Sequence, residues 1–258
     1  MILAIDIGNT NTVLGVMQED KILFTLRIRS DRNKTADEYM IHIDGLLRHK
    51  GINPEGIGGG ILSSVVPELS TVFSTAMEQL TGKKFLVVGS GIKTGLKIQT
   101  DNPAQLGADL VVDAVAALAK YKPPLVIFDM GTATTLSVIN GDGGYMGGMI
   151  MPGLRLSVDA LSARAAQLPY IHLAKPEKLI GTNTIDCMQS GAIYSSAAML
   201  DGLIDRVEEE LGQPVTAVAT GGLIGSVLPF CKRKIHGDEN LMLYGLNILY
   251  QKNHKIRL

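Results

Sequence analysis

The chain has no tryptophan, only two cysteines and almost no net charge. Only 5% of its 258 residues are aromatic while 46% are hydrophobic, so aliphatic side chains must fill the core. The two cysteines, Cys187 and Cys231, have neither the spacing of metal ligands nor that of a redox pair. We expect both to be buried as small hydrophobic side chains.

Charge and hydropathy exclude two classes of partner. Acidic and basic residues nearly cancel to a net charge of −1, and no basic stripe is present, so we expect no nucleic-acid partner. No apolar run approaches the length of a membrane span, so we expect no membrane partner. The chain runs directly into an apolar strand without a charged leader, which favours a cytoplasmic location.

One short pattern occurs twice, at the start of the chain and in its middle. Each copy is an apolar strand that ends in Asp, followed by a glycine turn and a run of hydroxyl or amide side chains. Asp6 corresponds to Asp129, Gly8 to Gly131, and Asn9 to Thr132. A repeat at this distance indicates a duplicated domain, so we predict two domains, residues 1–122 and 123–258.

The repeated turn has the chemistry of a phosphate site. A glycine after a strand allows a sharp turn with no Cβ to block a ligand. The neighbouring amide, hydroxyl and backbone N–H groups can then surround phosphate oxygens, although the Asp carboxylate needs a cation or water between itself and a phosphate. One copy alone would favour a plain Asx-type turn. Two copies favour a nucleotide held between the two halves.

Hydrophobic periodicity predicts the same order of elements in both halves. Three strands are followed by alternating helices and strands, which is typical of an α/β fold. In the first half we expect strands at 2–7, 12–17, 21–28, 61–67 and 85–88, with helices at 36–49, 68–81 and 103–120. In the second half we expect strands at 125–129, 134–139, 144–150 and 215–219, with helices at 154–165, 185–211 and 239–250.

The motifs together resemble those of type III pantothenate kinases over essentially the whole chain. This family lies within the superfamily of acetate kinase, sugar kinases, heat-shock ATPases and actin. The resemblance implies two duplicated ribonuclease H-like (actin-like ATPase) domains, each a mixed β-sheet flanked by helices. The motifs are Asp6–Asn11, Ser63–Pro67, Asp101–Pro103, Gly107–Asp109, Asp129–Thr134, Gly147-Gly148, Pro152-Gly153, Gly181–Thr184 and Thr220–Gly222.

The resemblance also implies a reaction and its participants. The family uses ATP to phosphorylate the primary hydroxyl of pantothenate, giving 4′-phosphopantothenate in the first step of coenzyme A biosynthesis. Mg²⁺ accompanies the ATP, and a monovalent cation, potassium or ammonium, is required. A homodimer with the pantothenate pocket near its subunit interface is also implied.

Specific residues match the family's functional positions. Asp109 resembles the catalytic proton acceptor, Asp129 the cation ligand, and Thr132 a phosphate contact. The ATP phosphates would be bound by Asp6, Ile7, Gly8, Asn9, Thr10, Asn11, Thr12 and Val13. Pantothenate would be bound by Gly107, Ala108, Asp109, Leu110 and Thr184.

Each assignment has a structural alternative. Asp109 could be a solvated i,i+4 neighbour of Asp113, and Asp129 could be inherited scaffolding. Thr184 could instead cap a helix that begins at Ile185. The Gly221-Gly222 pair could pass beneath the adenine or ribose, or could form a plain turn.

Two departures leave other functions open. The family commonly has Arg where this chain has Leu110, and Tyr where it has Thr100. A non-catalytic kinase-like transcriptional accessory protein is therefore one alternative, although the chain retains Asp6, Asp109 and Asp129. Another small-alcohol or sugar kinase of the same superfamily is the second.

Overall fold

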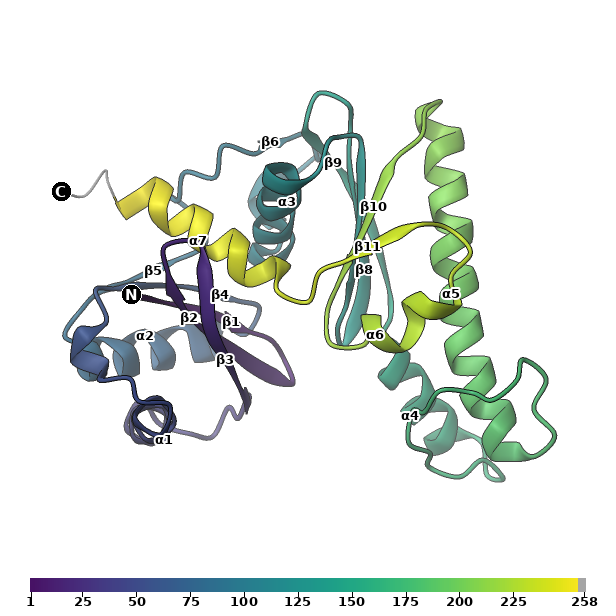
Figure 1. Cartoon of the computed structure of the whole chain (residues 1–258), viewed down its shortest axis with the longest axis horizontal. Helices are drawn as coiled ribbons and strands as arrows, with labels where there is room; N and C mark the ends of the chain where they lie inside the picture. Colours follow the sequence, from purple (N-terminus) through teal and green to yellow (C-terminus); the bar gives the residue numbers. More distant parts are fainter. Residues whose placement is uncertain (255–258) are drawn as a thin grey trace. The chain divides into compact units, whose positions relative to one another are not determined.

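Two mixed β-sheets, each flanked by helices, form the fold in the computed structural model, which describes residues 1–254 (Figure 1). This architecture confirms the fold class that the sequence predicts. The chain folds into two compact units, each built around one of the sheets.

The first sheet has the strand order β3-β2-β1-β4-β5. Its first three strands form an antiparallel meander, while β4 and β5 add in parallel beside β1. The strands are β1 (Ile2–Ile7), β2 (Asn11–Gln18), β3 (Lys21–Arg29), β4 (Gly60–Ser64) and β5 (Phe85–Val87).

Helices cover both faces of the first sheet, which explains the continuous apolar character of β1. Leu3, Ile5 and Ile7 pack toward α1 (Ala36–His49) and α2 (Pro67–Thr81). The alternate residue Ala4 packs with side chains of the C-terminal helix α7 (Leu241–His254) and of α3 (Ala108–Lys120). The side chains of β1 therefore alternate between two helical layers.

The second sheet repeats this order and adds one strand. Read from β9, it runs β9-β8-β7-β10-β11, with the short β6 beyond β9. The matching order and strand directions confirm the duplication that the sequence predicts. The strands are β6 (Lys97–Ile98), β7 (Leu125–Met130), β8 (Ala133–Ile139), β9 (Gly144–Pro152), β10 (Thr216–Thr220) and β11 (Ile235–Gly237).

One face of the second sheet packs against α4 (Leu154–Arg164) and the long helix α5 (Thr184–Leu211), which runs beside the strands in Figure 1. Val126, Phe128 and Met130 of β7 belong to this core. A short helix, α6 (Ile224–Val227), and three 3₁₀ turns complete the described elements: Pro54–Gly56, Pro103–Gln105 and Leu228–Phe230. The core residues of β7 again alternate with residues on the opposite face.

The compact units are not contiguous in sequence. The first consists of Met1–Leu96 and Asn102–Ala116 together with the C-terminal helix α7, whereas Lys97–Asp101 and Ala117–Asn240 form the second. This division differs from a single boundary after residue 122, since the last helix packs on the first sheet. Among residues 1–254, no helix is long and apolar enough to cross a membrane.

Three details differ from the sequence prediction. The helix predicted from residue 103 begins only at Ala108, after the Pro103–Gln105 3₁₀ turn and Gly107. The two- and three-residue strands β6 and β11 were too short to give a periodic signal. Burial of Cys187 was a wrong prediction: this side chain is exposed in the first turn of α5, while Cys231 is half-buried.

Candidate active site

The first glycine turn is a closed bend between β1 and β2. The Gly8 N–H donates to the Asn11 carbonyl oxygen over 3.0 Å. A Cβ on Gly8 would lie 3.0 Å from this same oxygen, so the tight bend favours glycine. Asn9 and Thr10 are exposed at the tip of the turn. Their polar groups are therefore placed to meet a ligand from solvent.

Asp6 lies on the sheet face that α7 and α3 cover. It is two residues from Ala4, which belongs to that core, so the two share a face. On the neighbouring parallel strand, Ser63 is in register with Asp6. The Ser63 hydroxyl is fully buried and has no hydrogen-bond partner among the described residues. An acidic oxygen and a hydroxyl oxygen are thus adjacent at the end of β1, and both are suitable ligands for a hard cation.

The other predicted phosphate contacts have different environments. Ile7 is fully buried in the core beneath α1 and α2. Thr12 is also fully buried, and its hydroxyl shares a 2.9 Å hydrogen bond with that of Ser30. Val13 packs with the opposite core, beside α7. These residues hold the turn in place, whereas Asn9 and Thr10 present its polar surface.

Asp109 lies in the first turn of α3 and is half-buried. Burial raises the pKa of its carboxyl group, and hydrogen bonds from the backbone N–H groups of Leu110 and of Asp109 itself oppose this shift. The Leu110 N–H lies 2.9 Å from Asp109 Oδ1. A carboxylate with a raised pKa, held by adjacent backbone, is suited to accept a proton from an alcohol.

The burial of Asp113 argues against a role for Asp109 in solubility. Asp113, one helical turn after Asp109, is only 2% exposed. An i,i+4 pair that serves solubility would have both carboxylates in water, so this alternative for Asp109 is wrong.

The second glycine turn is one residue shorter than the first. Gly8–Thr10 separate β1 from β2, but only Gly131 and Thr132 separate β7 from β8. The Gly131 N–H again donates across the bend, to the Ala133 carbonyl oxygen at 3.0 Å. Both turns nevertheless present two exposed residues, Asn9 and Thr10 in the first and Gly131 and Thr132 in the second.

Two further glycines pack closely against this second turn. A Cβ on Gly153 would collide with the Thr132 carbonyl oxygen. Gly221 has φ +99°, and a Cβ there would lie 2.6 Å from the Met130 carbonyl oxygen. The Gly221 position is therefore explained by close packing on the end of β7.

Asp129 lies between two threonines on the second sheet. Thr135 of β8 and Thr220 of β10 are both in register with Asp129, so the three side chains share one face of the sheet. The Thr135 hydroxyl oxygen is buried and has no hydrogen-bond partner among residues 1–254. One carboxylate flanked by hydroxyl oxygens fits a hard, oxygen-seeking cation.

Residues 1–254 contain no cluster of three or more His, Cys, Asp or Glu side chains that could hold a metal ion together. A cation at Asp129 would therefore need hydroxyl, water or phosphate oxygens to complete its coordination. Thr135 and Thr220, beside Asp129, supply the hydroxyl oxygens.

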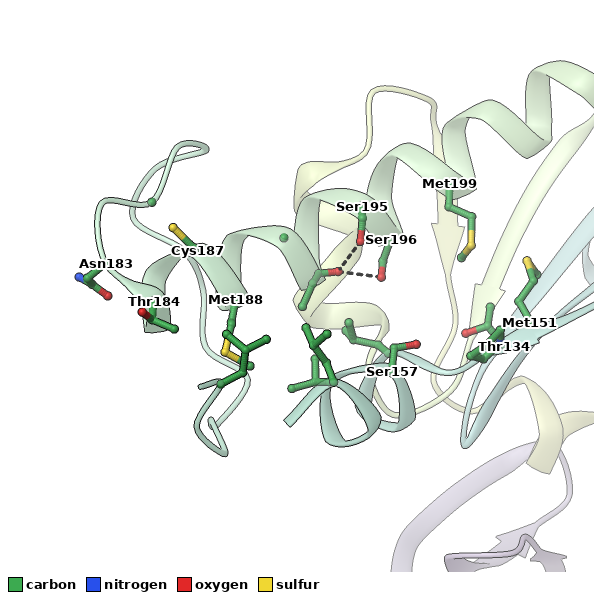
Figure 2. Close-up of a pocket in the computed structure, with 18 of the residues that line it drawn as sticks. Thr134, Met151, Ser157, Asn183, Thr184, Cys187, Met188, Ser195, Ser196 and Met199 are labelled. Atoms are coloured by element: carbon green, nitrogen blue, oxygen red, sulfur yellow. Dashed lines mark hydrogen bonds between the residues drawn. The ribbon is translucent and has the colours of Figure 1, made fainter. Parts of the chain in front are cut away.

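Thr184 lies at the edge of a cavity of about 1060 Å³ in the second unit. Figure 2 shows Thr184 and Cys187 at one end of the cavity, and Thr134 and Met151 at the other. Asn183 caps α5, because its side-chain oxygen accepts the Asp186 N–H over 3.0 Å. The suggestion that Thr184 is the N-cap is therefore wrong, and its exposed hydroxyl is not committed to capping.

The cavity and Asp129 lie on opposite faces of the second sheet. Thr134, which lines the cavity, alternates with Thr135, which is in register with Asp129. The cavity is also lined by α4 and α5, which cover only the first of these faces. Within this unit, therefore, the structure does not bring Thr184 and Asp129 together.

Solved structures of distant proteins share this duplicated fold. ROK hexokinase from Thermus thermophilus superposes with a TM-score of 0.50 at 12% identity, covering 99% of each chain. A Campylobacter jejuni chain, described provisionally as a Baf family transcriptional activator, superposes with a TM-score of 0.60 at 16% identity. The match covers 98% of this chain and 100% of the Campylobacter chain. These low identities show the fold alone, which is that of the actin-like ATPases and sugar kinases.

Sequence comparison identifies the family within this class. The model of the type III pantothenate kinase family matches residues 2–206. A type III pantothenate kinase from Exiguobacterium sp. is 45% identical over 255 residues, which cover 99% of this chain and 100% of the relative. The chain therefore belongs to the type III pantothenate kinase family.

Proposed function

We propose that this kinase transfers the γ-phosphoryl group of ATP to the primary hydroxyl of pantothenate, with Asp109 as the proton acceptor. Family membership supports the reaction, and the environment of Asp109 supports the role. Phosphoryl transfer depends mainly on positioning and charge compensation, with a carboxylate to orient the attacking hydroxyl. The half-buried Asp109 carboxylate with its raised pKa is the observation that carries this assignment.

In the first unit, we assign the ATP phosphates to the Gly8–Thr10 turn. Asn9 and Thr10 supply exposed side-chain donors, and Gly8 allows the backbone to approach. Asp6 and Ser63 would bind the Mg²⁺ that accompanies ATP through its water ligands. Gly107, Ala108 and Leu110 would shape the pantothenate site around Asp109.

In the second unit, we assign a monovalent cation, potassium or ammonium, to Asp129 and a phosphate oxygen to Thr132. The buried Thr135 hydroxyl beside Asp129 supports the cation assignment. Such a cation would compensate phosphate charge. Because the reaction consumes ATP, we place it in the cytoplasm.

We also propose that the enzyme is a homodimer in which Thr184 completes the pantothenate site of the partner copy. Thr184 lies on the opposite side of its own sheet from Asp129, so it is not placed to serve a site beside that residue. Large exposed apolar side chains gather in the same stretch of chain, which is typical of an interface. They include Met149, Ile150, Leu156, Leu161, Tyr170, Leu179, Ile180 and Ile185.

A coupled assay for ADP release tests the reaction. We expect ATP consumption only when pantothenate is present, and a higher rate in potassium or ammonium than in sodium. Sugars and other small alcohols serve as competing acceptors. Turnover of one of these in place of pantothenate would contradict the proposed reaction.

Mixing two inactive variants tests the shared site. Asp109→Asn and Thr184→Ala would each impair the homodimer, but a mixed dimer would contain one site with both native residues. We therefore expect the mixture to recover activity that neither variant shows alone. If subunit exchange is demonstrated and no activity returns, Thr184 does not act on the partner's site.

A further inference from the structure

We infer that Arg32 is a phosphate-binding residue of the first unit, and that its guanidinium contacts the terminal phosphates of ATP. The Arg32 Nη2 atom donates a 3.1 Å hydrogen bond to Asn9 Oδ1, at the tip of the first glycine turn. This inference rests on the proposed function, because it takes that turn to be the phosphate site. It adds a positively charged group to a turn whose other side chains are neutral or acidic.

The backbone that carries Arg32 is fixed to the turn at one end. The Ser30 N–H donates to the Thr10 carbonyl oxygen over 3.0 Å. The Ser30 hydroxyl is also hydrogen-bonded to the buried hydroxyl of Thr12, at 2.9 Å. The end of β3 is therefore joined to the last residue of the turn and to the start of β2, two residues before Arg32.

The buried Tyr39 side chain fixes the backbone of Asp31, the residue before Arg32. The fully buried Tyr39 hydroxyl accepts the Asp31 N–H at 2.8 Å and donates to the Asp31 carbonyl oxygen at 2.9 Å. Asp31 Oδ1 accepts the Asn33 N–H at 3.0 Å, which closes the bend around Arg32. Because the backbone of residues 30–33 is held in place before a ligand binds, binding an anion costs less conformational entropy.

The charge of Arg32 is available to a ligand. Arg32 is exposed and forms no ion pair with any carboxylate among residues 1–254. By contrast, Arg48 is paired with Asp44 at 2.8 Å, and Arg233 is paired with Asp205 and Glu208. A guanidinium whose hydrogen-bond acceptor is a neutral amide keeps its full attraction for phosphate.

The contact also orients Asn9. Arginine can only donate hydrogen bonds, so the Asn9 amide must turn its oxygen toward Arg32. The Asn9 amide NH₂ group is then free to donate elsewhere, as a phosphate oxygen requires. Arg32 retains further N–H donors beyond the one that Asn9 uses, and these can bind two phosphate oxygens in a fork.

Arg29 provides a second positive charge near the same turn. It is in register with Asn11 on the neighbouring strand. Arg29 therefore shares a sheet face with Asn11 and adds to the positive potential. The acidic groups nearby are Asp6, which would act through Mg²⁺, and Asp31, whose carboxylate bonds its own loop.

Direct nucleotide binding to the full chain tests the inference. Calorimetry would compare ATP with AMP, in the absence of pantothenate, for the wild type, Arg32→Gln and Arg32→Lys. We expect Arg32→Gln to weaken ATP binding by about tenfold to a hundredfold, the effect of a lost charged hydrogen bond. AMP affinity should not change, and Arg32→Lys should be intermediate because it keeps the charge without the fork.

Arg48→Gln is the matched control, since it removes an exposed arginine on α1 and should bind ATP normally. Asn9→Ala separates direct contact from orientation of the amide. If Arg32→Gln has no further effect on ATP binding in the Asn9→Ala background, Arg32 only positions Asn9 and the inference is overturned. Unchanged ATP affinity in Arg32→Gln, or an equal loss of AMP affinity, would overturn it as well.

The same proteins distinguish this inference from the proposed function. Arg32-dependent ATP binding without phosphorylation of pantothenate would refute the reaction and support the inference. Normal phosphorylation of pantothenate, with ATP binding that does not depend on Arg32, would support the reaction and refute the inference. If the wild type binds no ATP, both are overturned.

Discussion

The carboxylate of Asp109 occupies the place where a side chain on Gly107 would lie: a Cβ built on this glycine would collide with Asp109 Oδ1. Gly107→Ala should therefore push the carboxylate out of position. We expect a lower kcat with little change in ATP binding, because the displaced group is the proton acceptor. Steady-state kinetics with both substrates would check this. An unchanged kcat would show that the carboxylate does not need its present orientation.

Asp109→Asn should reduce turnover by about 10²- to 10⁴-fold, the usual contribution of general-base assistance. The same change should raise Tm at neutral pH. Since burial raises the pKa of Asp109 in the folded state, its charged form destabilises the fold above that pKa. Below the unfolded-state pKa the penalty disappears, so the two proteins should then have equal Tm. Thermal melts at about pH 8 and about pH 3 would test the sign.

The pH dependence of kcat/KM for pantothenate should reflect the same group. As pH falls, Asp109 takes up a proton and can no longer accept one from the alcohol. Because its pKa is raised, the acidic loss of activity should begin at a higher pH than for an ordinary aspartate. A profile of kcat/KM for pantothenate against pH, measured at saturating ATP, would locate this limb. An acidic limb at the position of a solvated aspartate would contradict the role.

Thr135→Val should weaken the response to potassium. This substitution keeps the shape of the side chain but removes the buried hydroxyl beside Asp129. We expect the potassium concentration for half-maximal activity to rise by about two- to tenfold, as for one lost neutral interaction. Ser137→Ala, also in β8, is a suitable control. The Ser137 hydroxyl is instead hydrogen-bonded to the Tyr145 hydroxyl of the neighbouring strand β9, at 3.0 Å. Equal effects from both variants would point to general damage to β8.

Gly221→Ala should destabilise the second unit. A methyl group there would be 2.6 Å from the Met130 carbonyl oxygen, and the φ of +99° is unfavourable for alanine. We expect a loss of about 1–3 kcal/mol in unfolding free energy, from backbone strain and overpacking together. Gly225→Ala, in the neighbouring short helix with only a distant glutamate oxygen at 3.9 Å, is the control. Urea denaturation would measure both.

The sequence predicted the sheets and the two glycine turns because these depend on local patterns. An apolar strand, an acidic residue and a glycine are consecutive at Asp6 and again at Asp129, so each turn can be recognised without knowing the fold. The end-to-end family resemblance then assigned roles to single positions. The structure adds the register that places Ser63 beside Asp6 and Thr135 beside Asp129.

Contacts between distant segments could not be predicted in this way. Nothing in the sequence near Arg32 indicates that its guanidinium bonds Asn9, 23 residues earlier. Likewise, Asn183 and Thr184 are both good capping residues, and only the hydrogen bond to Asp186 decides between them. The exposure of Cys187 depends on how the start of α5 is placed, which hydrophobicity alone does not specify.

The return of the last helix to the first sheet affects how the protein is made. Leu243, Leu246 and Leu249 of α7 are almost fully buried against that sheet, and Leu243 packs where Gly15 leaves room. On the ribosome, the middle of the chain can thus finish folding while the first-synthesised strands still lack their covering helix. A stop codon before residue 241 would therefore leave the amino-terminal sheet with an exposed apolar face, prone to aggregate.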